Sequence, residues 1–233
     1  AYFMEKELFS RIQYYIDVHN GDWFEDLTPF IYSVGNAAPE TVAKAEAMAR
    51  EADVPFYVKS GLADGGAYNY AGYLGIPSVL IERGCKGMWS EEEAEASRKD
   101  VRNILRSLGA LTTPKEFRKY TPVYMRHTHY IDSESEGCWT PVKNAGDVVR
   151  KGELIGVLRD YFGNIIEEVR LQEDCIILYQ TISYSVPKDS PLIAYGHYDT
   201  CVDEIDQDSH THEHHHGKKH MDMASHDLWE EIC

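Results

Sequence analysis

Two stretches of this 233-residue chain decide its fold: residues 12–19, IQYYIDVH, and residues 76–82, IPSVLIE. Both are short apolar runs, which is typical of buried strands. Helical patterns follow them, over residues 39–53 and from Ser90 to Gly109. This alternation of strands and helices predicts an α/β domain with parallel strands over residues 1–112.

The helix that begins after Ser90 has the clearer end signals. Ser90 precedes Glu93 by three residues, which is the spacing of a capping box. An apolar stripe follows at helical spacing and stops at Gly109, a residue that commonly ends a helix. In contrast, residues 62–75, LADGGAYNYAGYLG, indicate a loop that turns into a short helix packed closely on the sheet.

From residue 118 the pattern changes to short β-prone runs separated by turn residues, which predicts a small all-β domain over residues 118–197. Its segment NAGDVVRKGELIGVL, residues 144–158, is similar to the hammerhead of biotinyl and lipoyl domains. Those domains carry their cofactor on a lysine, and no lysine occurs here between Lys151 and Lys188. We therefore expect the module to be structural or to cover a substrate.

Residues 198–233 are acidic and contain seven of the eleven histidines of the chain. The segment is too polar to build a core, so we expect a flexible tail. Two hypotheses are open for it. Its imidazoles can chelate Zn²⁺, Ni²⁺ or Cu²⁺ and deliver or scavenge metal, or the segment is a solvated tail of little consequence.

Composition excludes several classes of partner. The net charge is −16 and basic residues do not cluster, which argues against binding to nucleic acid or to an anionic membrane. No apolar run approaches the roughly 20 residues that span a bilayer, and the first residues lack the charged, apolar and small-residue order of a signal peptide. Five scattered cysteines without a C-x-x-C pair indicate reduced thiols. We expect a cytoplasmic protein.

The candidate site residues stand where the two deciding strands end. His19 closes the first strand before a Gly turn, and Glu82 closes the second. Ligands bind at the carboxyl ends of strands in open α/β sheets. A neutral His is a common metal ligand and a nearby carboxylate can act as the general base of a metal-bound water, so the pair indicates metal-assisted hydrolysis. Asp17, two residues before His19, would orient the imidazole. The same residues also fit an ordinary hydrogen-bonded His and a solvated Glu.

Three motifs in this order carry a family resemblance: Asp-Val-His-Asn-Gly at 17–21, AGYLGIPSVLIERG at 71–84, and GDVVRKGELIG at 146–156. Over about residues 10–197 the chain resembles the succinylglutamate desuccinylase and aspartoacylase family. The resemblance implies a zinc-carboxypeptidase-like mixed-sheet catalytic domain, followed by a small all-β barrel-sandwich domain with the hammerhead.

Family members hold one Zn²⁺ through a His-x-x-Glu motif plus a later His, and a Glu acts as general acid and base. The resemblance implies that His19 is the later zinc ligand and that Glu82 is the catalytic carboxylate. The chain departs from the pattern because no His precedes His19, so the His-x-x-Glu pair is absent. The family's substrate-carboxylate arginine also falls upstream. We therefore expect residues 1–112 to be the C-terminal portion of the catalytic domain.

These observations predict a zinc-dependent deacylase that cleaves the amide bond of an N-acyl amino acid or a similar small acylated amine, incomplete in this chain. Its partner would be the small N-acylated substrate. Two alternatives are open: a metallocarboxypeptidase that acts on peptides, and a catalytically inactive protein that binds or sequesters metal.

Overall fold

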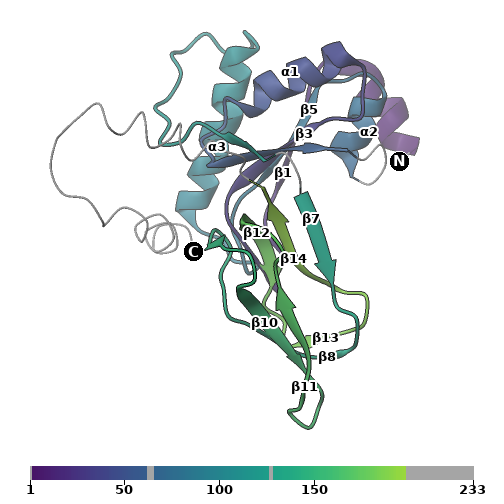
Figure 1. Ribbon diagram of the computed structural model, residues 1–233. Coiled ribbons are helices and arrows are strands. Elements are labelled where there is room, and N and C mark those ends of the chain that lie inside the picture. The colour runs from purple at the N-terminus through teal and green to yellow at the C-terminus, as the bar shows by residue number, and fades with distance from the viewer. Residues whose placement is uncertain (1, 62–65, 126–127, 198–233) are drawn as a thin grey trace, which may run out of the picture. The chain divides into compact units, whose positions relative to one another are not determined.

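The computed structural model describes residues 2–61, 66–125 and 128–197, and they divide into two compact units (Figure 1). As far as they are described, the first unit comprises residues 2–20, 29–83 and 89–124, and the second comprises residues 21–28, 84–88 and 125–197. The predicted tail, residues 198–233, lies outside the described residues.

A mixed sheet forms the centre of the first unit, with the strand order β1-β5-β3-β4-β6. β1 pairs with β5 in parallel and β3 pairs with β4 in parallel, while β3 and β5 are antiparallel. The expectation of parallel strands is therefore correct for the two deciding strands and wrong for one central pair. The strands are β1 (Tyr15–His19), β3 (Phe30–Val34), β4 (Phe56–Ser60), β5 (Ser78–Glu82) and β6 (Val123–Met125).

Helices cover both faces of this sheet. Helix α1 (Pro39–Ala49) and helix α3 (Glu91–Ser107) bury Met48 and Ile104 in one core together with Ile31. Helix α2 (Ala67–Tyr73) packs on the opposite face, where Gly72 lies so close to Val34 that a Cβ would come within 2.2 Å of it. A π-helical turn (Met4–Leu8) and a 3-10 turn (Phe9–Arg11) precede β1. The positions of α1, α2 and α3 agree with the three helices predicted from the sequence.

The start of α3 follows the predicted cap. Ser90 Oγ accepts a hydrogen bond of 3.1 Å from the backbone N–H of Glu93. This bond satisfies one of the N–H groups that a helix leaves unpaired at its first turn. The carboxylate of Glu93 faces Arg83, whose Nη1 lies 3.6 Å from Oε2. Burial raises the pKa of Glu93, and the lowering effect of Arg83 does not cancel it.

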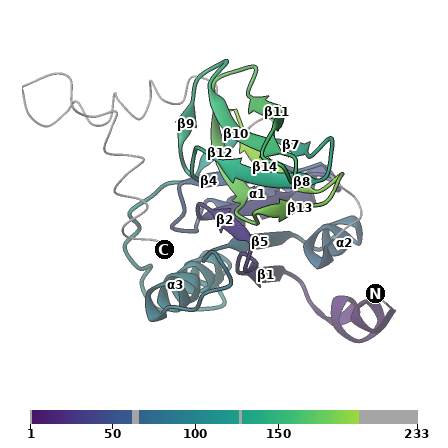
Figure 2. The ribbon, with the colours of Figure 1, turned by 90° about the horizontal axis from the view of Figure 1, so that it is seen from below.

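Antiparallel strands build the second unit, in two sheets that share one core (Figure 2). One sheet has the order β11-β10-β8-β13, and the other has the order β2-β12-β14-β7 with β9 beside β12. Trp139, Leu158 and Ile177 are among the buried residues that both sheets contribute. The strands are β2 (Glu25–Leu27), β7 (Thr128–Asp132), β8 (Gly137–Pro141), β9 (Val148–Val149), β10 (Leu154–Arg159), β11 (Ile165–Arg170), β12 (Cys175–Thr181), β13 (Ser185–Val186) and β14 (Pro191–Gly196).

The hammerhead-like segment crosses between the two sheets. β9 pairs with β12 and β10 pairs with β8 and β11, so the Lys151-Gly152 turn connects strands of different sheets. The backbone N–H of Glu153 closes this turn by donating to the carbonyl of Arg150 at 3.0 Å. Gly152 has φ +84°, a conformation that favours glycine.

The strand β2 and the cysteines are two further features of the fold. Strand β2 pairs with β12, so residues 25–27 belong to the second unit. Cys138 and Cys175 are free and buried, as the expectation of reduced thiols requires of them. Within the described residues, no helix has the length and apolar character needed to cross a membrane.

Candidate functional site

His19 and Glu82 lie side by side at the carboxyl ends of β1 and β5. The parallel register places His19 directly opposite Glu82, and His19 Nδ1 lies 3.6 Å from Glu82 Oε1. Immediately beyond this pair, the backbone N–H of Arg83 donates to the His19 carbonyl at 3.4 Å. The structure thus brings together the two residues that the strand ends suggested, and their chemical roles stay predictions.

Asp17 lies on the other side of the imidazole. His19 Nε2 is 3.5 Å from Asp17 Oδ1, as expected for residues two apart on a strand. The His19 side chain is 47% exposed, whereas those of Asp17 and Glu82 are 19% and 17% exposed. The imidazole therefore has a carboxylate near each nitrogen and keeps access to solvent. Asp17 also affects a second neighbour: burial, and then the Asp17 carboxylate, raise the pKa of Tyr15.

A buried ionic network fixes the chain directly after Glu82. The Arg83 side chain is 8% exposed and its Nε donates to Asp100 Oδ2 at 2.7 Å. Arg83 Nη2 donates to the backbone carbonyl of Asp53 at 2.6 Å, and the Asp53 N–H donates to Asp100 Oδ1 at 2.6 Å. These bonds tie the end of β5 to α3 and hold the Glu82 backbone in place. No local motif marks Asp100 in the sequence, because it is a single acidic residue on the buried side of α3.

The residues around His19 do not complete a catalytic zinc site. Such a site typically has three protein ligands and an open position for water. Asp17, His19 and Glu82 do not bring one donor atom each within 4.8 Å of one another. Among the described residues, that criterion is met by His129, Glu173 and His197, which all belong to the second unit. The donor set at His19 therefore fits only part of a zinc site.

Cys175 is not a candidate nucleophile that could replace the metal-assisted chemistry considered for His19 and Glu82. Cys175 is fully buried, and burial together with nearby Glu173 raises the pKa of its thiol to about 12. A nucleophilic cysteine needs a lowered pKa and access to the substrate. Cys175 has neither, so we assign it to the core of the second unit.

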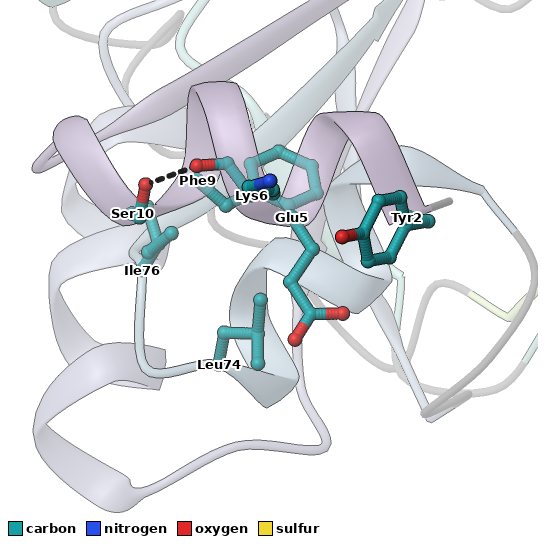
Figure 3. Close-up of a pocket in the computed structure, with 7 residues that line it drawn as sticks. All are labelled: Tyr2, Glu5, Lys6, Phe9, Ser10, Leu74 and Ile76. Atoms are coloured by element: carbon teal, nitrogen blue, oxygen red, sulfur yellow. Dashed lines mark hydrogen bonds between the residues drawn. The ribbon is translucent and has the colours of Figure 1, made fainter.

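A hollow of about 610 Å³ occurs in the first unit. Figure 3 shows residues that line it, and neither His19 nor Glu82 is among the lining residues. Phe9 and Ile76 line it, close to the amino ends of β1 and β5. His19 and Glu82 stand at the carboxyl ends of the same strands. The hollow therefore lies at the amino ends of β1 and β5, and the paired side chains lie at their carboxyl ends. This hollow is not the candidate catalytic pocket.

Comparison with known proteins identifies the fold. No protein-family model and no curated protein matches the sequence. The solved product-bound structure of the ectoine utilization protein EutE (DoeB) from Ruegeria pomeroyi superimposes with a TM-score of 0.76 at 20% identity. The chain has the fold of this solved structure. A succinylglutamate desuccinylase/aspartoacylase from Rhodobacter sphaeroides gives a TM-score of 0.73 at 20% identity, and a succinylglutamate desuccinylase from Silicibacter sp. TM1040 gives 0.70 at 17%.

The predicted resemblance to the succinylglutamate desuccinylase and aspartoacylase family is thus confirmed for the fold. The EutE match covers 85% of this chain and 62% of the EutE chain. The Rhodobacter and Silicibacter matches each cover 84% of this chain and 62% of theirs. The chain therefore spans about three fifths of the length of the proteins whose fold it shares.

Proposed function

We propose that this chain forms part of a zinc-dependent deacylase that hydrolyses the amide bond of an N-acyl amino acid or a similar small acylated amine. One observation carries the proposal: His19 and Glu82 stand in register at the carboxyl ends of two parallel strands, in a fold shared with succinylglutamate desuccinylases. Ligands of open α/β sheets bind at such an edge. The first unit would then be a carboxypeptidase-like catalytic domain, and the second a barrel-sandwich domain with a hammerhead.

Each residue of the pair has a distinct role in this proposal. His19 offers a neutral imidazole nitrogen as a metal ligand, and Asp17 at 3.5 Å orients the ring. Glu82 accepts a proton from the attacking water and returns it to the leaving amine, so that a carboxylate and an amine are released. Its side chain suits this exchange because it is 17% exposed and borders the imidazole.

Zinc, when bound, would supply Lewis acidity and a more acidic water. One imidazole does not hold zinc at useful affinity, so the proposal requires ligands beyond the described residues. We also propose that the protein works in the cytoplasm on a small-molecule substrate, without nucleic acid or membrane as a partner. The net charge of −16 supports the exclusion of nucleic acid and anionic membranes.

The proposal is tested by two substitutions, in the protein at the length that its source organism makes. Glu82→Gln keeps the size of the side chain and removes the base, so we expect zinc content to persist while kcat on N-acyl amino acids falls by about 10²–10⁴-fold. His19→Ala removes a ligand, so zinc measured by atomic emission should fall by about one equivalent per chain relative to the parent. Glu40→Gln, on the exposed first turn of α1, is the matched control. Normal turnover in Glu82→Gln, or unchanged zinc in His19→Ala, would contradict the proposal.

The incomplete donor set at His19 favours a second candidate, a catalytically inactive protein that binds or sequesters metal. A metallocarboxypeptidase is a third, because the same side chains could act on a peptide bond. A hydrolysis screen separates the three. Release of an amino acid from N-acyl amino acids supports the deacylase, shortening of peptides from the C-terminus supports the carboxypeptidase, and metal binding without hydrolysis supports the inactive protein.

A further inference from the structure

We propose that His129, Glu173 and His197 form a second metal site, which takes a zinc-class divalent ion and clamps three segments of the second unit together. The three side chains offer two imidazole nitrogens and one carboxylate oxygen within 4.8 Å of one another. This set is one that Zn²⁺ uses in proteins. The site lies wholly within the second unit and does not depend on the role of His19 or Glu82.

The pairing of β7 with β14 places the two histidines on one face. His129 lies opposite Tyr195 in this antiparallel ladder, and His197 follows Tyr195 by two residues. His197 comes directly after the end of β14, and its imidazole lies beside that of His129. Their ring centroids are 5.5 Å apart with planes at 89°. The ring of Tyr195 lies 5.3 Å from that of His129 and packs beside it.

Glu173 reaches the histidines from the turn that precedes β12. The turn is held on both sides: the backbone N–H of Lys151 and the Nη1 of Arg150 each donate to Asp174 at 2.9 Å. The backbone N–H of Gly152 also donates to the carbonyl of Leu171 at 2.7 Å. The backbone that carries Glu173 is therefore fixed before any ion binds, which lowers the entropic cost of binding.

The donor distances suit a shared ion after small side-chain rotations. Glu173 Oε1 lies 2.5 Å from His197 Nε2 and 3.9 Å from His129 Nε2. Ligands bonded to zinc at their usual lengths of about 2.0–2.2 Å in a tetrahedron are about 3.3 Å apart. The two observed distances bracket this value. His129 and Glu173 are about half exposed and free to adjust, whereas His197 is 13% exposed and more firmly placed.

An ion here would act as a structural clamp. It would connect β7, the end of β14 and the turn before β12, which are far apart in the sequence. Because it binds the folded unit and not the unfolded chain, it would raise the thermal midpoint of unfolding. Three protein ligands leave a fourth position for water.

The seven histidines of residues 198–233 would also bind metal in solution, so the test removes their donors and keeps the full chain. The background protein carries seven substitutions in that segment: H210Q, H212Q, H214Q, H215Q, H216Q, H220Q and H226Q. In this background, each of His129→Gln, Glu173→Gln and His197→Gln is made singly. Glu168→Gln on β11, an exposed carboxylate of the same unit, is the matched control, and His19→Ala controls for the candidate catalytic site.

Zinc binding is measured by isothermal titration calorimetry with ZnCl₂, and thermal unfolding is followed with and without ZnCl₂. We expect the background protein to bind zinc and to gain thermal stability from it. Each substitution of the three ligands should weaken this binding at least about tenfold and abolish the gain, since losing even a supporting residue of a metal site costs about 10–100-fold. Glu168→Gln and His19→Ala should leave this binding event unchanged.

Two results would overturn the inference. One is a background protein that binds no zinc, which would place all binding in the 198–233 segment. The other is binding that persists unchanged in all three ligand variants. Cobalt gives an independent readout, because Co²⁺ at the site should show visible d–d absorption that His129→Gln removes. Neither result bears on Glu82, so the deacylase proposal stands or falls separately.

Discussion

Arg83 shows how one buried residue can set the position of its neighbour. Its guanidinium joins Asp100 and the backbone of Asp53, and Glu82 precedes it directly at the end of β5. A guanidinium suits this place because its planar fork serves two acceptors at once. The buried charges cost desolvation free energy, and the geometry recovers it only while both partners are present.

We predict that Arg83→Met lowers the free energy of unfolding by about 3–5 kcal/mol, because it leaves the fully buried Asp100 carboxylate without its cation. Urea unfolding followed by circular dichroism measures the change. The matched control is Arg98→Met, since Arg98 pairs with Glu91 and Glu95 on the exposed surface of α3. Exposed pairs contribute about 0–1 kcal/mol. Equal decreases in the free energy of unfolding of the two variants would show that the buried network around Arg83 stabilises the protein no more than an exposed ion pair does.

At the scale of elements, local signals predict what depends on neighbours in sequence. Helix α3 begins after Ser90 and ends before Gly109, because capping and periodicity both act within a few residues. Strand β2 has no such signal. Its three residues, Glu25–Leu27, are defined by pairing with β12, which lies far along the chain. Sequence could therefore predict α3 and could not predict β2.

We predict that Ser90→Ala destabilises the protein by about 1 kcal/mol, because it removes the hydroxyl that accepts from the N–H of Glu93. Ser97→Ala is the control. Ser97 lies inside α3, where alanine has the higher helix propensity, so its substitution should be neutral or slightly stabilising. Chemical denaturation of both variants measures the difference. A Ser90→Ala protein as stable as the Ser97→Ala protein would show that the cap contributes nothing.

Glu93 also predicts a dependence on pH. Burial raises its pKa in the folded protein, so folding disfavours the ionised form. The folded state then holds its proton to higher pH than the unfolded state, and stability falls as pH rises from the unfolded pKa through the folded one. Glu93→Gln should remove this loss, so its stability relative to the parent should increase between about pH 4 and pH 7. A difference that does not vary with pH in this range would contradict the prediction.

At the scale of the molecule, the two candidate sites differ in how far sequence could reveal them. His19 and Glu82 each end an apolar strand, and the rule that ligands bind at the carboxyl ends of strands brings them together without a structure. His129, Glu173 and His197 lie on different elements with no motif spacing. Sequence drew attention to the dense histidines of residues 198–233 and missed this dispersed set, because only the pairing of β7 with β14 makes it local.

The two units have separate cores, and Gly156 gives a way to perturb the second one. A Cβ at this position would lie 2.3 Å from the indole of Trp139, a residue that is buried in that core. We therefore predict that Gly156→Ala destabilises the second unit by about 1–3 kcal/mol, the usual cost of overpacking. Gly61→Ala is the control, since its Cβ would meet nothing within 4 Å.

Urea unfolding of both variants measures the change in the free energy of unfolding. Amide hydrogen exchange should place the loss of protection in β8, β10 and β12, while α1 and α3 keep theirs. Equal loss of protection in both units would mean that they unfold as one cooperative body, and that the clamp proposed at His129 would stabilise the whole molecule as well as the second unit.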